Sequence, residues 1–244
     1  MNLQDHLITP DWPAPKNVRA LQTTRLGGIS SSPYDSLNLG DHVGDTPLVV
    51  ARNRMLLNTL VPSEPVWLKQ VHGTVVANAD LAGCLPQADA CIARHRDAVC
   101  VVMTADCLPV LLCDHQGTVV GAAHAGWKGL AAGVIEATVQ AMDVAPQNLM
   151  AWLGPAISQP AFEVGAEVRA VFVDADPQAT AAFIPGQNGK WLADIYALAY
   201  LRLNALGITH IYGGNFCTYR ERERFFSYRR DGVTGRMGTF IWIE

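Results

Sequence analysis

Two apolar runs separated by a short polar turn constrain the fold of this chain more than any other feature. Residues 108–113 and 118–123 are rich in valine and leucine, so each is typical of a β-strand. The polar segment 114–117 ends in glycine and predicts a turn, which makes the pair a hairpin. Cys107 then lies at the open end of the first strand and His124 at the open end of the second. A thiol and an imidazole placed together indicate either a metal site or a nucleophile with its base.

The rest of the pattern predicts one α/β (or α+β) domain, with mixed β-sheets flanked by helices. Further strands are expected at 18–24, 66–70, 74–79, 98–103, 149–154, 208–214, 224–230 and 237–244, and helices at 47–60, 129–142, 165–173 and 191–206. Strands dominate the middle of the chain without regular alternation with helices, which argues against a doubly wound parallel sheet. No linker or shift in composition marks a boundary, so residues 1–244 are expected to form a single domain.

Composition limits the partners and the compartment. The 244 residues are 50% hydrophobic and carry a net charge of −4 without a basic patch, so we expect a large core and no nucleic-acid partner. The start of the chain lacks a signal-peptide pattern, and no apolar run reaches the ~18 residues that span a membrane. We therefore expect a cytoplasmic monomer without membrane association. Apart from Cys107, the cysteines are expected to be buried, reduced thiols: Cys84, Cys91, Cys100, Cys113 and Cys217.

Several common catalytic motifs are missing. The sequence has no G-x-x-x-x-G-K-[ST], G-x-G-x-x-G, H-E-x-x-H or G-x-S-x-G motif, which removes local support for ATP-driven, dinucleotide-dependent, zincin and α/β-hydrolase chemistry. It also lacks the H-x-H pairs expected of a multicopper oxidase and the H-x-E and P-C-x-x-C motifs of zinc base deaminases.

Three residues remain as a candidate centre: His72, Cys107 and His124. Each lies at or near a predicted strand end, where loops can converge on one pocket. Two imidazoles and one thiolate fill three positions of a tetrahedral zinc site and leave the fourth open, as in catalytic sites. Asp106 places a charged group in apolar surroundings, which usually requires a partner or a role. The segment 126–129, Gly-Trp-Lys-Gly, opens the next helix and offers free N–H groups to an anion.

Charged residues elsewhere are weaker candidates. Arg25 precedes a pair of glycines, and Arg229 and Arg230 lie in the segment SYRRDGVTGRMG. Arginine binds carboxylate or phosphate in a bidentate manner, but a solvated surface position explains these residues equally well. Glu163 is a candidate acid or base, or a residue that caps the helix beginning near Val164.

Seven segments together resemble the YfiH family over residues 12–244: TTRLGGISSSPYDSLNLGDHVGD, WLKQVHG, QADA, MTADCLPVLLCD, AAHAGWKGLAAGV, WLGPAISQPAFEVG and FFSYRRDGVTGRMG. The family has been described as a multicopper polyphenol oxidase or laccase-domain family, and as a peptidoglycan editing factor. The resemblance implies a single α/β domain of the kind grouped with a cytotoxic-factor cysteine hydrolase. It implies zinc held by His72, Cys107 and His124. It also implies purine nucleoside phosphorylase activity on adenosine, inosine and methylthioadenosine, together with adenosine deaminase activity.

These implications lead to a working hypothesis of phosphorolysis and deamination in one zinc pocket. Arg25, Lys128 and Arg229 are the candidates for binding phosphate or substrate. Asp106 or Glu163 is the candidate for moving a proton to the departing purine.

Three different functions stay open on the sequence alone. Cys107 can serve as the nucleophile of a metal-free hydrolase acting on cell-wall peptide precursors, with His124 or His72 as its base. A non-enzymatic zinc module would need a fourth ligand, for which Cys113 and His115 are available. A copper polyphenol oxidase is the third, against which the missing H-x-H pairs count.

Overall fold

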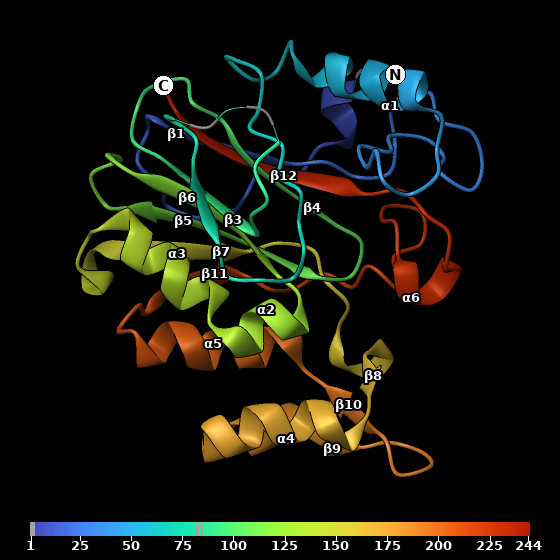
Figure 1. The fold of residues 1–244 in the computed structure, drawn as a ribbon, viewed down its shortest axis with the longest axis vertical. Helices are drawn as coiled ribbons and strands as arrows, with labels where there is room; N and C mark the ends of the chain where they lie inside the picture. The colour runs from blue at the N-terminus through green and yellow to red at the C-terminus, as the bar shows by residue number, and fades with distance from the viewer. Residues whose placement is uncertain (1–2, 82, 84) are drawn as a thin grey trace.

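The computed structural model describes residues 3–81, 83 and 85–244 (Figure 1). Its strands are β1 Val18–Gln22, β2 Val76–Asn78, β3 Ala90–Ala93, β4 Cys100–Thr104, β5 Leu108–Asp114, β6 Val120–Ala125, β7 Leu149–Leu153, β8 Glu163–Val164, β9 Phe183–Pro185, β10 Trp191–Ala193, β11 His210–Gly213 and β12 Met237–Ile243. Its α-helices are α1 Pro47–Leu57, α2 Trp127–Ala132, α3 Val134–Met142, α4 Ala166–Ala175, α5 Ile195–Ala205 and α6 Tyr228–Asp231.

A mixed six-stranded sheet in the order β11-β7-β5-β6-β3-β2 forms the centre of the molecule. The outer pairs β11–β7 and β3–β2 are parallel, and the inner neighbours are antiparallel. A three-stranded antiparallel sheet, β1-β12-β4, packs on one face, while α2, α3 and α5 cover the other (Figure 1). The small sheet β8-β10-β9 and α4 form a separate layer near the edge. This architecture confirms the expected mixed α/β fold.

The side chains of β5 explain why the predicted hairpin lies in the middle of the sheet. Leu108, Val110 and Leu112 belong to the core on the helix side, whereas Leu111 and Cys113 belong to the core between the two sheets. Successive side chains of a strand point to opposite faces, so a strand buried on both faces is apolar along its whole length. Burying each leucine contributes roughly 1.5–3 kcal/mol, which makes the hairpin a rigid platform for residues at its end.

The hairpin itself is confirmed. β5 and β6 pair antiparallel, with Leu108 opposite Ala125 and Cys113 opposite Val120. Cys107 and His124 consequently lie at the same end of the two strands.

The strands predicted at 66–70 and 224–230 do not form. In both segments, hydrogen bonds that involve side chains take the place of hydrogen bonds between strands. In the segment 66–70 only Val66 forms a bridge, with Cys100. Gln70 fastens the rest of this segment to β4, because its side-chain amide donates to Met103 O at 2.9 Å and accepts from Met103 N at 2.8 Å. The segment 224–230 is no strand either, since the Ser227 hydroxyl accepts from Arg230 N and begins the short helix α6.

Some element boundaries differ from expectation because of local backbone chemistry. The helix expected at 129–142 is divided at Gly133, whose φ of 97° is left-handed, into α2 and α3. The helix expected from residue 191 begins only at Ile195, where the Asp194 side chain accepts from Ala197 N. Strand β3 is missing from the sequence prediction, because its Ala-Cys-Ile-Ala sequence is poor in the β-branched and aromatic residues that mark strands.

The cysteines agree with expectation where they are described. Cys91, Cys100, Cys113 and Cys217 are free and buried, and Cys107 is free and half-buried. Cys84 lies outside the described residues. Within the described part of the chain, no helix is both long and apolar enough to cross a membrane.

Candidate metal centre

The structure brings His72, Cys107 and His124 together. One potential ligand atom from each lies within 4.8 Å of the other two. Cys107 Sγ is 3.8 Å from His72 Nε2, and the two imidazole rings meet edge to face with their centroids 4.7 Å apart. Cys107 and His124 come from the end of the β5–β6 hairpin, and His72 comes from the loop that precedes β2.

Asp89, the residue before β3, holds both histidines in place. Its fully buried carboxylate accepts hydrogen bonds from three consecutive main-chain N–H groups, those of Val71, His72 and Gly73, at distances from 2.7 to 3.2 Å. It also lies 2.9 Å from His124 Nδ1. His72 adopts a left-handed φ of 62°, as the tight loop around the carboxylate requires. Because Asp89 accepts the proton of His124 Nδ1, the Nε2 atom of His124 is left to face the cluster.

The three groups perturb one another's ionisation. Burial raises the pKa of the Cys107 thiol, but the charge of His124 and hydrogen bonds from His124 and His72 outweigh it and bring the pKa to about 6. Burial lowers the pKa of His124, but Cys107 and Asp89 raise it to about 9. Burial raises the pKa of Asp89, and its hydrogen bonds from His124, Gly73 and Val71 lower it overall. In the absence of metal, Cys107 is therefore a thiolate at neutral pH, the form that binds metals and attacks electrophiles.

Two cavities meet at the cluster and share His72, Ala105, Cys107 and Tyr228 as a common wall. The first, which we call the Arg236 cavity, has a volume of about 340 Å³ and is also lined by His42, Gln70, Met103, Thr104, His124 and Arg236. The second, which we call the Trp127 cavity, has a volume of about 300 Å³ and is also lined by Asp106, Trp127, Lys128, Ile157, Phe162 and Arg229. The cluster is thus open to space on two sides.

Gly126 leaves the room that the cluster needs. A Cβ atom at this position would lie 2.8 Å from His72 Cδ2 and 2.9 Å from Cys107 Sγ, closer than side chains tolerate. The glycine of the predicted anion-binding segment therefore has a steric role beside the centre.

Asp106 lies next to Cys107, but its carboxylate already has partners. It accepts from Thr218 Oγ1 at 2.6 Å and from Arg229 N at 2.7 Å, and its backbone has a left-handed φ of 94°. Asp106 thus ties the loop that leads into α6 to the start of β5. This contact also places Arg229 on the wall of the Trp127 cavity.

The remaining predicted residues divide into two groups. Lys128 and Arg229 line the Trp127 cavity, as a substrate-binding role would require. Glu163 and Arg25 line neither cavity. Glu163 pairs with Lys190 at 2.8 Å.

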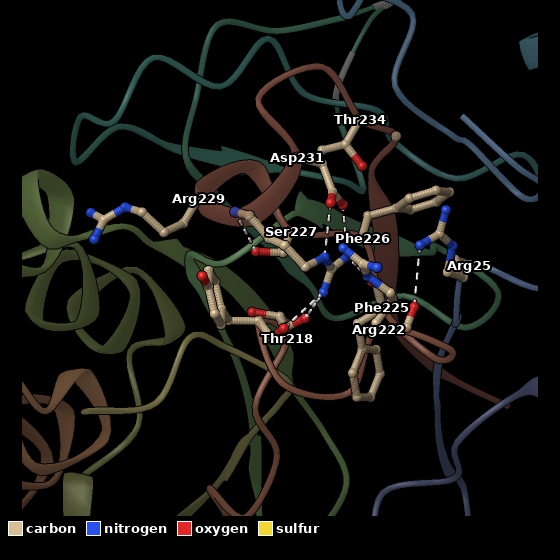
Figure 2. Close-up of polar contacts among 12 residues, drawn as sticks. Arg25, Thr218, Arg222, Phe225, Phe226, Ser227, Arg229, Asp231 and Thr234 are labelled. Carbon is tan, nitrogen blue, oxygen red and sulfur yellow. Dashed lines mark hydrogen bonds and ion pairs between the residues drawn. The ribbon is translucent and has the colours of Figure 1, made fainter. Parts of the chain in front are cut away.

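Arg25 belongs to a different part of the surface. It donates to Asp35 O at 2.9 Å and to Arg222 O at 3.2 Å, and it lines a separate cavity of about 440 Å³. Figure 2 shows Arg25 and Arg229 on opposite sides of the segment that carries Phe225 and Ser227. The structure therefore does not bring Arg25 to the cluster.

Sequence reasoning singled out neither Asp89 nor Arg236. Asp89 carries the same signal as Asp106, a charged residue just before an apolar run, and that signal was available in QADACIA. Arg236 has no comparable signal, because nothing local distinguishes it from the other arginines of its segment.

The donor set fits a metal ion. A thiolate and two imidazoles are the ligands that zinc prefers, and in tetrahedral coordination they leave one position open. A carboxylate behind one ligating histidine is the usual support for that ligand. Among the described residues, this is the single cluster of three or more potential ligands.

Comparison with known proteins identifies the family. Residues 19–244 match the family model described as "Multi-copper polyphenol oxidoreductase laccase". The purine nucleoside phosphorylase YfiH of Escherichia coli (strain K12) is 56% identical over 243 residues, which cover 97% of this chain and 98% of that protein. The purine nucleoside phosphorylase PA4543 of Pseudomonas aeruginosa is 53% identical over 238 residues, covering 97% and 98%. The crystal structure of Neisseria meningitidis protein NMB0706, of family DUF152, has a TM-score of 0.96 and 54% identity, and the match covers 98% of this chain and 99% of that one.

These similarities extend over nearly the whole chain and include the His72, Cys107 and His124 region. The protein therefore belongs to the YfiH family of laccase-like domains.

Proposed function

We propose that this protein is a zinc-dependent purine nucleoside phosphorylase. The observation that carries the proposal is the cluster of His72, Cys107 and His124 at the junction of two cavities, braced by Asp89. The names of its relatives support the substrate class, purine nucleosides and phosphate. The resemblance adds adenosine, inosine and methylthioadenosine as the individual substrates.

The proposed reaction needs space for phosphate and for the nucleoside next to the three residues of the cluster. Phosphate displaces the purine at the anomeric carbon of the ribose, so the C1′–N9 bond breaks as a C1′–O bond forms. His72, Cys107 and His124 would hold the zinc beside the wall that the cavities share. When bound, zinc supplies Lewis acidity that polarises an oxygen or a water brought to it. Trp127 and Phe162 contribute aromatic rings to the lining of the Trp127 cavity, which suits contact with a purine.

Proton transfer to the departing purine needs an acid or a water near the Trp127 cavity. Asp106 lines that cavity, whereas Glu163 lies outside both cavities and pairs with Lys190. Of the two carboxylates predicted from the sequence, Asp106 is therefore the better candidate for this role.

We further propose adenosine deaminase activity at the same centre. The cluster occupies three ligand positions and opens onto cavities large enough for water and a nucleoside. Deamination consumes water and releases ammonia, so unlike phosphorolysis it does not depend on phosphate.

The test measures ribose 1-phosphate and inosine formed from adenosine, with and without phosphate, in the wild type and in Cys107→Ser. Ribose 1-phosphate is expected only with phosphate, and inosine under both conditions. Cys107→Ser should lose zinc and both activities together. Adenine release that ignores phosphate would contradict the phosphorylase assignment and indicate a hydrolase.

A second candidate function has an observation of its own. Cys107, His124 and Asp89 follow one another as the nucleophile, base and orienting carboxylate of a cysteine hydrolase do. Such an enzyme could act on cell-wall peptide precursors. It predicts turnover in metal-free protein and a covalent adduct on Cys107. If chelation abolishes all turnover and zinc restores it, the hydrolase assignment fails.

A closed zinc module and a copper oxidase receive less support. A closed module needs a fourth protein ligand, but Cys113 is buried at the far end of β5, and His115 packs against His210 with ring centroids 5.0 Å apart. A copper oxidase conflicts with the absence of H-x-H pairs, despite the description of the family model. We expect no phenol oxidation that scales with bound copper, and an oxidase assay on copper-titrated protein checks this.

A further inference from the structure

We propose that Arg236 binds the phosphate co-substrate, so that the Arg236 cavity is the oxyanion subsite and the Trp127 cavity receives the purine. This inference rests on the proposed phosphorylase function and assigns its two reactants to the two cavities. It gives the phosphate role to a residue other than Arg25, Lys128 and Arg229.

The guanidinium of Arg236 has no direct ion pair with a carboxylate among the described residues, although six other arginines are so paired: Arg19, Arg25, Arg54, Arg202, Arg224 and Arg230. Its Nη1 donates only to main-chain carbonyls, Thr234 O at 3.1 Å and Gly235 O at 3.0 Å. The residue is half-buried, and burial lowers the pKa of its guanidinium, although the nearby Cys107, Asp106 and Tyr228 raise it in part. A partly desolvated cation that lines a cavity attracts an anion more strongly than one in water.

The position of Arg236 is built by a distant part of the chain. The side-chain oxygen of Asn38 accepts from Arg236 N and from Gly40 N, both at 2.9 Å. A Cβ atom at Gly40 would lie 2.8 Å from Arg236 Cγ. The next loop residues bring His42 to the same cavity. The segment SLNLGDHVGD, to which the metal centre assigns no role, is thus shaped around the stem of this arginine.

A second observation concerns Thr104, the last residue of β4. Its hydroxyl is buried without a hydrogen-bond partner, and the residue is 1% exposed and lines the Arg236 cavity. Of the unpartnered buried side-chain atoms in the described residues, it alone belongs to a residue that lines either cavity. Buried hydroxyls are nearly always hydrogen-bonded, so this one keeps an unused donor beside the cavity. An unpaired cation and a free hydroxyl form a donor set suited to a phosphate oxygen.

The chemistry of displacement agrees with two separate subsites. A nucleophile approaches the sugar from the face opposite to the leaving group, so phosphate and purine must lie on opposite sides of the ribose. The C1′–N9 electron pair stays with the purine, which takes the proton that hydrogenphosphate brings, and the products are free base and ribose 1-phosphate. The two cavities share four lining residues and so lie next to one another, and their other lining residues differ.

The cations of the Trp127 cavity are weaker candidates for phosphate. Lys128 is exposed, and Arg229 extends an exposed guanidinium that donates to Glu163 O at 2.8 Å. The Arg229 guanidinium also lies over the ring of Phe162, 5.6 Å from its centroid. Exposed cations are hydrated and screened by salt. Trp127 and Phe162 make the same cavity the better place for an aromatic base.

The test separates the Michaelis constants of the two substrates. Phosphorolysis is measured with phosphate varied at saturating nucleoside, and the reverse, in wild type, Arg236→Met, Thr104→Val and Arg229→Met. Arg236→Met should raise the KM for phosphate about 100-fold and Thr104→Val about tenfold, since hydrogen bonds to charged groups are lost, with little change in the KM for nucleoside. Arg229→Met should affect the nucleoside instead.

Control variants separate loss of phosphate binding from loss of folding. Direct measurement of phosphate binding separates the subsite from the reaction. Arg94→Met removes an arginine that also donates to a main-chain carbonyl, Met142 O at 2.6 Å, and lines neither cavity, so its constants should equal those of the wild type. Thr104→Val decides the question if Arg236→Met does not fold, because that hydroxyl makes no hydrogen bond to the protein that could be lost. Calorimetric titration of the zinc-loaded proteins with inorganic phosphate should show binding to the wild type, Arg94→Met and Arg229→Met, loss of binding in Arg236→Met and weaker binding in Thr104→Val.

The outcomes distinguish this inference from the proposed function. An unchanged KM for phosphate in both Arg236→Met and Thr104→Val, with phosphorolysis intact in the wild type, would overturn the subsite and leave the phosphorylase standing. Phosphate binding that depends on Arg236 in a protein without phosphorolysis would support the subsite and refute the reaction. Absence of phosphate binding to the wild type would overturn the subsite.

Discussion

Replacing Asp89 with asparagine tests how one buried carboxylate supports the centre. Its two oxygens accept from Val71 N, His72 N, Gly73 N and His124 Nδ1. An amide keeps one acceptor and turns the other position into a donor that faces main-chain N–H groups. Since hydrogen bonds to a charged group contribute about 1.5–3 kcal/mol each, losing one or two should cost roughly 1.5–6 kcal/mol of unfolding free energy. For a chain of this size, that lowers the melting temperature by roughly 3–24 °C.

The same substitution should weaken the binding of zinc. Without the carboxylate, the Nδ1 proton of His124 loses its charged acceptor, and the ring is free to adopt the tautomer whose Nε2 cannot bind a metal. Loss of such an outer contact typically reduces metal affinity about 10- to 100-fold. Competition with a chromophoric chelator measures this, and thermal unfolding in chelator measures the stability of the metal-free fold.

Asp80→Asn is the matched control. Asp80 also accepts main-chain hydrogen bonds, from Arg94 N at 3.0 Å and His95 N at 3.0 Å, but contacts none of the cluster residues. Both variants should unfold at lower temperature, and only Asp89→Asn should lose zinc affinity. An unchanged zinc affinity in Asp89→Asn, or an equal loss in the control, would refute the reasoning.

The dependence of the unfolding free energy on pH in the acid range provides a second measurement. The pKa of Asp89 is held below its ordinary value of 3.8, so its contribution to the metal-free fold is fully present above that pH. The contribution is lost as pH falls from 3.8 through the lowered pKa. Asp89→Asn should therefore be destabilised relative to the wild type near neutral pH, and the difference should shrink in acid. Unfolding free energies measured by urea titration at several pH values check the sign.

Three further predictions concern the same centre. The protein should bind close to one zinc per chain, and the double variant His72→Ala, His124→Ala should lose it by elemental analysis; full occupancy in that variant would remove the ligand assignment. Zinc affinity should rise with pH between about 6 and 9. In this range the Cys107 thiolate is already formed, whereas His124, with its pKa near 9, must release a proton before it can bind the metal. Chelator competition measures the affinity at each pH, and a flat profile would show that His124 is no ligand. Cys107 should resist iodoacetamide in zinc-loaded protein and react with it at neutral pH after chelation. Cys113, which is buried and has its pKa raised to about 12, should stay unmodified in both states. Labelling is measured by mass spectrometry, and equal labelling of Cys107 with and without metal would contradict the prediction.

Part of the centre is encoded locally and could be predicted from the sequence. The β5–β6 hairpin follows from two apolar runs and a turn, and the hairpin alone brings Cys107 and His124 to one end. The spacing of hydrophobic residues and the preferences of turn residues act over a few positions, so they can be recognised in a single sequence. The same holds for the apolar length of β5, which required burial on both faces.

The proximity of His72 needed the tertiary structure. Its loop is fixed by Asp89, which comes from the start of β3, a strand of mostly small residues with little β signature. Sheet order places β3 between β2 and β6, next to His124. Pairing between strands far apart in the sequence depends on how whole faces pack, and no local pattern carries that information.

The arginines show the same division. The sequence presents Arg25, Arg229 and Arg236 as equivalent cations near glycines. Packing alone gives Arg25 the carboxylate of Asp35, leaves Arg229 exposed and places Arg236 in a cavity whose lining contains no carboxylate. The free energy of a charge depends on desolvation and on its nearest counter-charge, both set by residues distant in the chain. The amino-acid sequence therefore determined which charged side chains the protein has. The tertiary fold decided which of these arginines is free of a carboxylate partner and can bind a ligand.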